Sequence, residues 1–293
     1  MAPLCPSVLL SQAYASFLAQ RGTLIQAAID AAGMEFFDAI ELPTVAAATE
    51  RKELRQIARD SHWDVMVWAS DVQASEHLSL AALDHSERKR AQLRFQDLVR
   101  AASECGARRF GFCSPPESPA EHRADAICFF RDELVELSFA ARKCGVAVSL
   151  EALDRKAHKR GLMGLTAETA DFASSIRSVV PEFGLVWDTA HTALNGEDLI
   201  ESFRLSASHV TAVHFSDAAL DPASRQYGDW HMQVGSGDAM KPPVIRRLLT
   251  ELCESSRSRK TQFTLAIEEL NIAPQRSGAE CLTQAWNSLG DCL

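Results

Sequence analysis

Four side chains that commonly bind metal ions end four successive strand-like runs in the second half of the chain. The runs are short and mostly apolar, and they end in Glu151, Asp188, His214 and Glu268. In a barrel of parallel strands the carboxyl ends lie side by side around one mouth, where barrel enzymes place their chemistry. Three carboxylates and an imidazole gathered there would be unfavourable without a cation among them. The sequence therefore predicts a metal-dependent enzyme.

The ligand types indicate the metal and the reaction. Three oxygen donors and one nitrogen suit Mn²⁺, Mg²⁺ or Co²⁺ better than a thiolate-rich structural zinc site, although Zn²⁺ stays open. We expect such a site to bind a hydroxy-carbonyl substrate and to stabilise an enediolate as a proton leaves the neighbouring carbon. Glu151 and Glu268 would flank that carbon as the acid/base pair. The alternative interpretation is that the four residues are solvated at the rim of the barrel.

Several other residues are candidates for contacts with the substrate. His191 follows the carboxylate of the sixth strand by three residues. We expect it to contact a substrate oxygen, with a second metal or a loop hydrogen bond as alternatives. Asp229 and His231 are either additional ligands or residues that shape their loop. Trp68 and Cys113, near the ends of the third and fourth strands, either line the pocket or pack in the core.

A basic run follows the carboxylate of the fifth strand, above the predicted mouth. It consists of Arg155-Lys156 and His158-Lys159-Arg160. Such a run either binds a phosphate or carboxylate of the substrate or forms a solvated loop face. The glycine pair of Val234-Gly-Ser-Gly-Asp238 is by itself only a weak sign of phosphate binding.

Alternating strands and helices are expected to position these residues. The expected strands cover 8–13, 37–42, 65–70, 109–113, 146–151, 183–188, 210–215 and 262–268. Expected helices over 23–32, 86–105 and 129–144 are followed by Gly33, Gly106 and Gly145, which suit left-handed C-caps. Eight such units predict an α/β fold, a (β/α)₈ barrel in which residues 1–293 form one domain. An open doubly wound sheet fits less well because no glycine-rich phosphate turn follows the first strand.

The size of side chains alternates along the strands and indicates which side faces the barrel interior. In the fifth, sixth and eighth strands the candidate ligand shares a side with the smaller residues. We assign that side to the interior and the bulky side to the helix layer. The same rule favours Glu268 over its neighbour Glu269, which shares a side with Leu265 and Ile267.

Length and composition limit the class of protein. The 293 residues are 46% hydrophobic, enough for a large core, and no run reaches the roughly 18–20 apolar residues of a membrane span. The eight cysteines include no Cys-x-x-Cys pair and the N-terminus does not resemble a signal peptide, so we expect reduced thiols and a cytoplasmic location. The formal net charge of −9 argues against a nucleic-acid partner.

Five stretches resemble the xylose isomerase-like TIM barrel superfamily, in particular its sugar phosphate isomerase/epimerase branch. They are Leu150–Arg155, Gly184–His191, Val213–Asp217, Val234–Asp238 and Ala266–Glu268. The resemblance implies that the four strand-end residues are the metal ligands. It also implies that the two glutamates double as the acid/base pair and that the histidine of the Asp-x-x-His pair touches the substrate.

The chain departs from this superfamily's ketose 3-epimerases at two places. Ala157 stands where those enzymes have a further glutamate, and their arginine after the seventh strand has its nearest candidate in Arg225. AP endonuclease IV, a zinc phosphodiesterase, also belongs to the superfamily, and Asp229-x-His231 looks like part of its third zinc site. Its additional histidines at the early strand ends are missing here.

These observations predict a divalent-metal-dependent isomerase or epimerase of a small sugar, sugar phosphate or related hydroxy-carbonyl compound. The alternatives are a metal-dependent dehydratase or lyase of an inosose or dehydroshikimate-like substrate, an AP endonuclease IV-like phosphodiesterase and a non-catalytic sugar-binding barrel. The expected partner is a small sugar-like molecule. The resemblance also allows a homo-oligomer, since family members often form dimers or tetramers.

Overall fold

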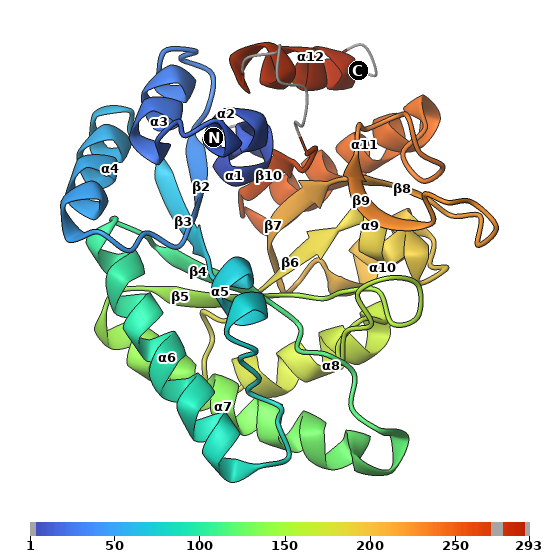
Figure 1. Ribbon diagram of the computed structural model, residues 1–293. Coiled ribbons are helices and arrows are strands. Elements are labelled where there is room, and N and C mark those ends of the chain that lie inside the picture. The colour runs from blue at the N-terminus through green and yellow to red at the C-terminus, as the bar shows by residue number, and fades with distance from the viewer. Residues whose placement is uncertain (1–3, 271–277, 291–293) are drawn as a thin grey trace.

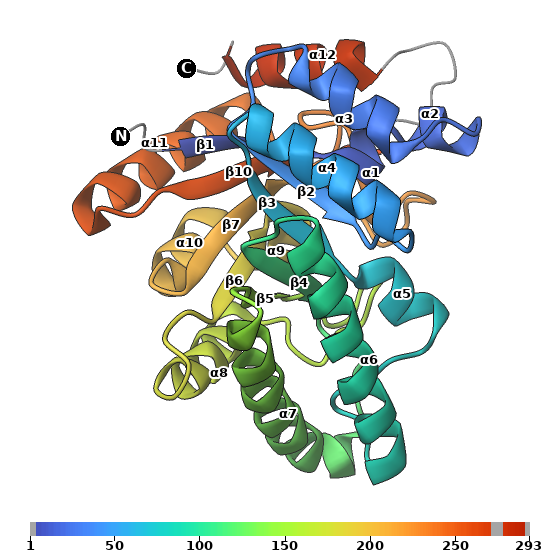
Figure 2. The ribbon, with the colours of Figure 1, turned by 90° about the vertical axis from the view of Figure 1, so that its left-hand side faces the viewer.

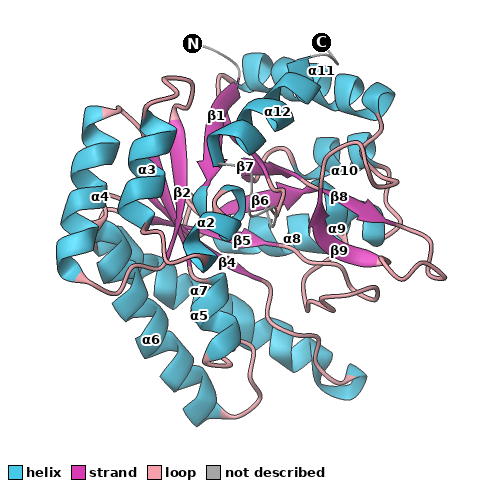
Figure 3. Cartoon of the chain, turned by 45° about the horizontal axis from the view of Figure 1, so that its top comes forward, coloured by secondary structure: helices cyan, strands magenta, loops and turns pink. Residues whose placement is uncertain are grey.

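The structure, a computed structural model, describes residues 4–270 and 278–290. Eight parallel strands close into a barrel in the order β1-β10-β7-β6-β5-β4-β3-β2, and helices surround it (Figures 1 and 3). This arrangement confirms the predicted (β/α)₈ fold. The predicted extent of the domain, 1–293, reaches residues outside the described part of the chain, at 1–3, 271–277 and 291–293.

Seven of the eight barrel strands begin and end within two residues of their predicted limits. The barrel strands are β1 (Leu4–Leu9), β2 (Ala39–Pro43), β3 (Asp64–Trp68), β4 (Arg109–Cys113), β5 (Ala147–Glu151), β6 (Gly184–Asp188), β7 (Val210–Phe215) and β10 (Phe263–Ile267). The prediction for the first strand was wrong by four residues. Leu4 already pairs with Phe263 of β10, and the apolar run that continues past Leu9 turns into a short helix.

The layer around the barrel contains α3 (Leu24–Ala32), α4 (Ala48–Asp60), α6 (His85–Glu104), α7 (Arg123–Lys143), α8 (Thr166–Arg177), α10 (Leu199–Ser206), α11 (Pro242–Arg259) and α12 (Gly278–Gly290). Shorter helical segments are α1 (Leu10–Ala13), α2 (Ala15–Ala19), α5 (Ser70–Ser75), η1 (Ala120–His122) and α9 (Thr189–Leu194). Gly106 and Gly145 have φ values of 85° and 73° and confirm the expected left-handed caps. Gly33 has a φ of −63°, so the prediction of a left-handed cap at Gly33 is wrong. The residue with a left-handed backbone after α3 is Glu35.

The interior of the barrel follows the predicted alternation of side chains. An apolar layer fills it and consists of Leu9, Met66, Trp68, Val186, Ala212 and Ala266. Three of these precede predicted ligands by two residues and therefore lie one level below them on the same side of their strands. On the opposite side of β6, Trp187 packs against Phe203 of α10, with ring centroids 5.5 Å apart. In β6 and β10 the side with the smaller residues thus faces inward, as predicted, whereas β1 and β3 turn the bulky Leu9, Met66 and Trp68 inward.

Two further features complete the chain around this frame. Helix α12 lies beside α3 (Figure 2), where Trp286 packs edge-to-face on Phe36 and Phe37 at centroid distances of 5.1 and 6.2 Å. After β7 the chain forms an antiparallel hairpin of β8 (Asp217–Ala219) and β9 (Gly228–Met232), which lies apart from the barrel sheet (Figure 3). This hairpin brings additional side chains to the barrel mouth.

Two sequence expectations concern thiols and membranes. The cysteines at 5, 105, 113, 128, 144 and 253 are free thiols, whereas the side chains of Cys281 and Cys292 lie outside the described part. Within the described residues, no helix combines the length and the apolar character needed to cross a membrane.

Candidate active site

The four predicted ligands meet at the mouth of the barrel. Glu151, Asp188 and His214 lie on β5, β6 and β7, and Glu268 directly follows β10. Each offers one ligand atom, and these atoms all lie within 4.8 Å of one another. All four side chains are buried. Three carboxylate oxygens and one nitrogen at this spacing suit the coordination of one divalent cation.

His214 lies at the centre of this cluster. Its Nδ1 is 2.8 Å from Glu268 Oε2 and 3.5 Å from Glu151 Oε1. Burial disfavours the imidazolium form, but Glu41 and Glu268 raise the pKa of His214 well above its usual value. The excess of carboxylate charge that holds a proton on this ring also favours a divalent cation among the same ligand atoms.

Asp188 is held in place by the start of helix α9. Its Oδ1 accepts a hydrogen bond from the His191 backbone N–H at 2.8 Å, which caps the helix, and its Oδ2 accepts one from Ser216 Oγ at 2.5 Å. Burial raises the pKa of Asp188 to about 6, and nearby Glu268 and Glu151 add to this effect against the lowering by His191. The carboxylate is therefore fixed in orientation, and a positive ion would favour its charged form.

Glu41, on β2, is a further candidate site residue that was not predicted from the sequence. Its Oε2 accepts hydrogen bonds from His214 Nε2 at 3.0 Å and Trp68 Nε1 at 2.7 Å, and its Oε1 accepts one from Ser7 Oγ at 2.9 Å. Burial opposes its charge, but His214 lowers the pKa of Glu41 below its usual value. A carboxylate on the far nitrogen of a metal-binding histidine fixes the ring and its tautomer. The signal was present in the sequence, because Glu41 shares the inward side of β2 with the small Ala39.

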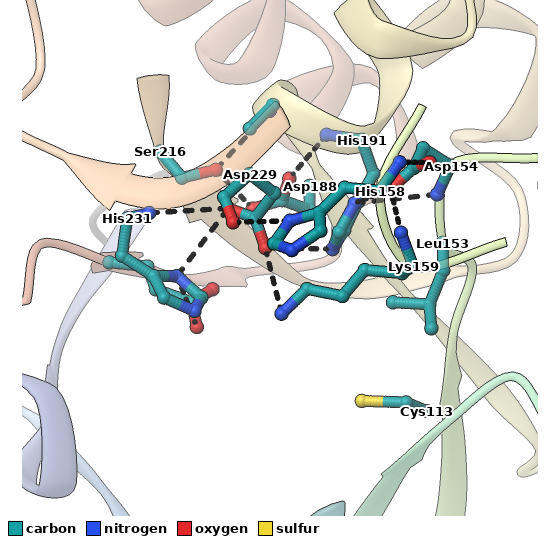
Figure 4. A network of polar contacts seen from close by, with 12 residues as sticks. Cys113, Leu153, Asp154, His158, Lys159, Asp188, His191, Ser216, Asp229 and His231 are labelled. Atoms are coloured by element: carbon teal, nitrogen blue, oxygen red, sulfur yellow. Dashed lines mark hydrogen bonds and ion pairs between the residues drawn. The ribbon is translucent and has the colours of Figure 1, made fainter. Parts of the chain in front are cut away.

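A second group of polar residues lies around Asp188 (Figure 4). His191 Nδ1 lies 3.5 Å from Asp154 Oδ2, and its Nε2 lies 3.7 Å from Asp229 Oδ2. Burial lowers the pKa of His191, but the hydrogen bond to Asp154 and the charges of Asp188 and Asp229 outweigh it and raise the pKa to about 10. His191 lines the cavity at the barrel mouth, where its predicted contact with a substrate would be made.

The hairpin places Asp229 and His231 on the same side of β9, facing the cluster. His231 Nδ1 lies 3.2 Å from Glu268 Oε1 and 3.7 Å from Asp229 Oδ1. Burial raises the pKa of Glu268, but His231 and His214 lower it to about 2. Glu268 therefore stays charged between two imidazoles. Both Asp229 and His231 line the cavity.

The cavity at the mouth has a volume of about 450 Å³, within the usual range for small-molecule sites. Residues at the ends of the first four strands line it together with residues of the predicted site. Leu9, Pro43, Trp68, Leu78 and Leu153 form apolar parts of this lining. Gln12, Gln73, His77, Lys159 and the acidic residues form polar parts. Trp68 thus contributes both to the wall and to the hydrogen bonds of Glu41.

Two of the predicted substrate-binding residues lie outside this lining. Arg155 forms ion pairs with Glu117 and Glu168, and its backbone N–H donates to Asn195 Oδ1, which leaves its guanidinium in a separate charged cluster. Arg225 is exposed on the loop between β8 and β9, because the hairpin carries that loop away from the barrel (Figure 1). The structure therefore does not bring either arginine to the cavity.

Two other candidate residues from the sequence, Lys159 and Cys113, do reach the cavity. Lys159 lines it, with its Nζ 3.4 Å from Asp229 Oδ2. Cys113 Sγ donates a hydrogen bond to Glu151 Oε2 at 3.2 Å. Burial and the charge of Glu151 raise the pKa of this thiol well above its usual value. Cys113 is accordingly a protonated hydrogen-bond donor that lines the cavity, the first of the two interpretations given to it from the sequence.

Comparisons with known proteins identify the same fold. A family profile described as xylose isomerase-like TIM barrel matches residues 26–252. The structure of IolI protein with a bound zinc atom matches with a TM-score of 0.75 and 15% identity, over 99% of this chain and 98% of that one. 3-Keto-D-glucoside 4-epimerase from E. coli matches with a TM-score of 0.70 and 15% identity over 100% of both chains.

D-Psicose 3-epimerase with D-tagatose, from Clostridium cellulolyticum H10, matches with a TM-score of 0.67 and 14% identity, over 98% of this chain and 92% of that one. A sequence search of curated proteins finds no match. Likeness at these identities shows a shared fold, while the family profile covers most of the chain. The chain belongs to the xylose isomerase-like TIM barrel family.

Proposed function

We propose that the protein is a divalent-metal-dependent isomerase or epimerase of a small sugar or related hydroxy-carbonyl compound. The observation that carries this proposal is the buried cluster of Glu151, Asp188, His214 and Glu268. Glu151, His214 and Glu268 of this cluster also line the 450 Å³ cavity. Structural neighbours described as sugar epimerases support the same reaction class. The neighbour described as IolI protein with a bound zinc atom supports a divalent metal in this fold.

The donor set fits a divalent cation, which would be held by these four residues. When bound, the cation polarises a substrate carbonyl and offsets the negative charge that develops on the substrate oxygens. Glu41 keeps a hydrogen-bonded carboxylate on His214 Nε2, so the other nitrogen, Nδ1, faces the shared ligand atoms. Ser216 and the His191 amide fix the two oxygens of Asp188.

Glu151 and Glu268 are the acid/base pair in this proposal. They approach the cavity from β5 and from the end of β10, which are separated by β6 and β7 in the barrel. One carboxylate would remove a proton from the carbon beside the carbonyl, and either the same or the other one would return it. Their surroundings differ, since the neutral thiol of Cys113 contacts Glu151 and an imidazole, His231, contacts Glu268.

The test is a turnover assay on protein purified without chelator and loaded in turn with Mn²⁺, Co²⁺, Mg²⁺ and Zn²⁺. Ketoses, sugar phosphates and inososes are incubated with it in D₂O. Isomerisation with deuterium entering the carbon beside the carbonyl is the expected result, whereas loss of water would assign a dehydratase. E151Q and E268Q are each expected to lower turnover by roughly 10²–10⁴-fold, the usual contribution of general acid/base catalysis.

Metal content separates binding from catalysis. D188N is expected to lower metal stoichiometry, because it removes one charged ligand, whereas E53Q, an exposed change on α4, is expected to leave metal and turnover unchanged. Full turnover after removal of metal by a chelator, or near-wild-type rates in both glutamine variants, would contradict the proposal.

A further inference from the structure

The usual place for a phosphate in a (β/α)₈ barrel is occupied by a protein side chain. Such sites commonly use backbone amides in the loops after the seventh and eighth strands. Here the fully buried Asp217 accepts hydrogen bonds from Gly235 and Gly237 at 3.0 and 2.9 Å and from Ala239 and Met240 at 3.0 and 3.1 Å. The amides of this glycine turn are therefore bound already.

The cavity also offers little positive charge for a phosphate. Among the residues described, Lys159 is the only lysine or arginine in its lining. Its Nζ faces Asp229 Oδ2 at 3.4 Å, so the two charges offset each other. The ring of His191, which also lines the cavity, lies between the carboxylates of Asp154 and Asp229, so its positive charge is offset. Asp71, Glu151 and Glu268 also line the cavity and would repel a dianion.

The pair of Lys159 and Asp229 nevertheless has unused hydrogen-bonding capacity. Asp229 is 2% exposed, and its Oδ2 has no hydrogen-bond partner among the described residues. Lys159 Nζ at 3.4 Å and His191 Nε2 at 3.7 Å both exceed the 2.7–3.2 Å of ordinary N–H···O hydrogen bonds. A buried acceptor without a hydrogen bond lowers the stability of the protein unless a donor binds to it.

Neighbouring contacts hold this pair in position. Asp154 accepts hydrogen bonds from the backbone N–H groups of His158 and Lys159 at 2.6 and 2.9 Å, which fixes the loop after β5. The ring of His158 bonds to the carbonyl oxygen of Asp229 through Nδ1 at 2.8 Å. The loop and the hairpin are thus joined, and both side chains of the pair face the cavity (Figure 4).

We propose that Lys159 and Asp229 form a hydroxyl-binding pair that selects an uncharged polyhydroxy substrate over its phosphate ester. A hydroxyl group is both donor and acceptor, so it can donate to Asp229 Oδ2 while it accepts from Lys159 Nζ. A phosphate dianion only accepts, so it cannot satisfy Asp229 and is repelled by it. This inference rests on the proposed function, because it concerns the substrate of the same pocket.

Two matched probes test the pair without turnover. A four-carbon polyhydroxy hydroxamic acid chelates the metal at one end and carries hydroxyls at the other, and its terminal phosphate ester differs only in charge. Isothermal titration of Mn²⁺-loaded protein is expected to show at least tenfold tighter binding of the uncharged probe. K159M and D229N are each expected to weaken that binding by roughly 10-fold or more, the loss of one charge-assisted hydrogen bond.

D229N has a further expected effect that a merely structural role would not produce. It leaves the Lys159 charge uncompensated. The affinity for the phosphate ester is therefore expected to rise at least fivefold relative to the affinity for the uncharged probe. K156M and D221N, changes of the same type at exposed positions, are expected to bind both probes as the wild type does.

Equal or tighter binding of the phosphate ester by the wild type would overturn the inference. Binding of neither probe, or wild-type affinities in both K159M and D229N, would overturn it too. The proposed function is tested separately, before any probe is added. If D188N bound as much metal as the wild type, the proposed function itself would fail.

Discussion

The carboxylate of Glu41 should govern the affinity of the site for its metal although it is not among the four ligands. We consider the substitution Glu41→Gln. In the structure Glu41 Oε2 accepts from His214 Nε2 and Trp68 Nε1, while Oε1 accepts from Ser7 Oγ. A glutamine with its oxygen in the place of Oε2 keeps both N–H bonds, and its amide can donate to the Ser7 hydroxyl. The substitution therefore preserves the shape and removes only the charge.

The magnitude follows from the role of this contact. A charge-assisted hydrogen bond is roughly twice as strong as a neutral one, and the 3.0 Å contact to His214 is buried on both sides. Loss of such an outer partner typically costs 10–100-fold in metal affinity, which corresponds to about 1.4–2.8 kcal/mol. We expect E41Q to weaken binding by that factor while the metal-free protein keeps its fold.

The assay is calorimetric titration of chelator-stripped protein with Mn²⁺ at pH 7, with circular dichroism to compare the folds. E53Q removes the same charge from an exposed position on α4 and should bind Mn²⁺ as the wild type does. If E41Q bound Mn²⁺ with wild-type affinity, the assignment of His214 as a ligand oriented by Glu41 would be refuted.

Two further predictions concern stability and are read from urea denaturation. Burial opposes the charge of Asp154, but hydrogen bonds from His191 and two backbone amides lower its pKa. D154N should therefore cost about 1.5–3 kcal/mol at pH 7. Because the folded pKa lies below the unfolded value of about 3.9, this contribution is present above roughly pH 4 and is lost as pH falls further; a cost that persisted at the lowest pH would contradict the reasoning. G237A should cost about 1–3 kcal/mol, because its Cβ would lie 2.5 Å from Asp217 Oδ1. G33A, where the nearest contact is 3.4 Å, is the control, and equal effects of the two would contradict the steric explanation.

The elements that carry the site were predictable because their signals are local. The alternation of small and bulky side chains along a strand depends on neighbouring residues alone. It distinguishes Glu268 from Glu269 without knowledge of any tertiary contact. The first strand was misplaced for a related reason, since an apolar run such as Val8–Ala13 is compatible with a strand or with a buried helix. Pairing of Leu4 with Phe263 decides between them, and that pairing joins opposite ends of the chain.

The cavity wall was less predictable because it depends on loops. Nothing local distinguishes Lys159, which reaches the cavity, from Arg155, which binds Glu117 and Glu168 instead. The difference arises from contacts between segments far apart in the sequence, such as the one between the loop after β5 and the hairpin. Glu41, by contrast, was predictable from local sequence. It shares the inward side of β2 with the small Ala39, but the alternation of side-chain size was applied only to residues at the ends of later strands.

The apolar layer beneath the cluster has a consequence for traffic through the barrel. Val186, Ala212 and Ala266 fill the interior one level below the cluster and close the described part of the barrel there. An ion at the cluster and an organic ligand would then share the approach from the barrel mouth. A ligand bound over the cluster would therefore slow the release of the ion.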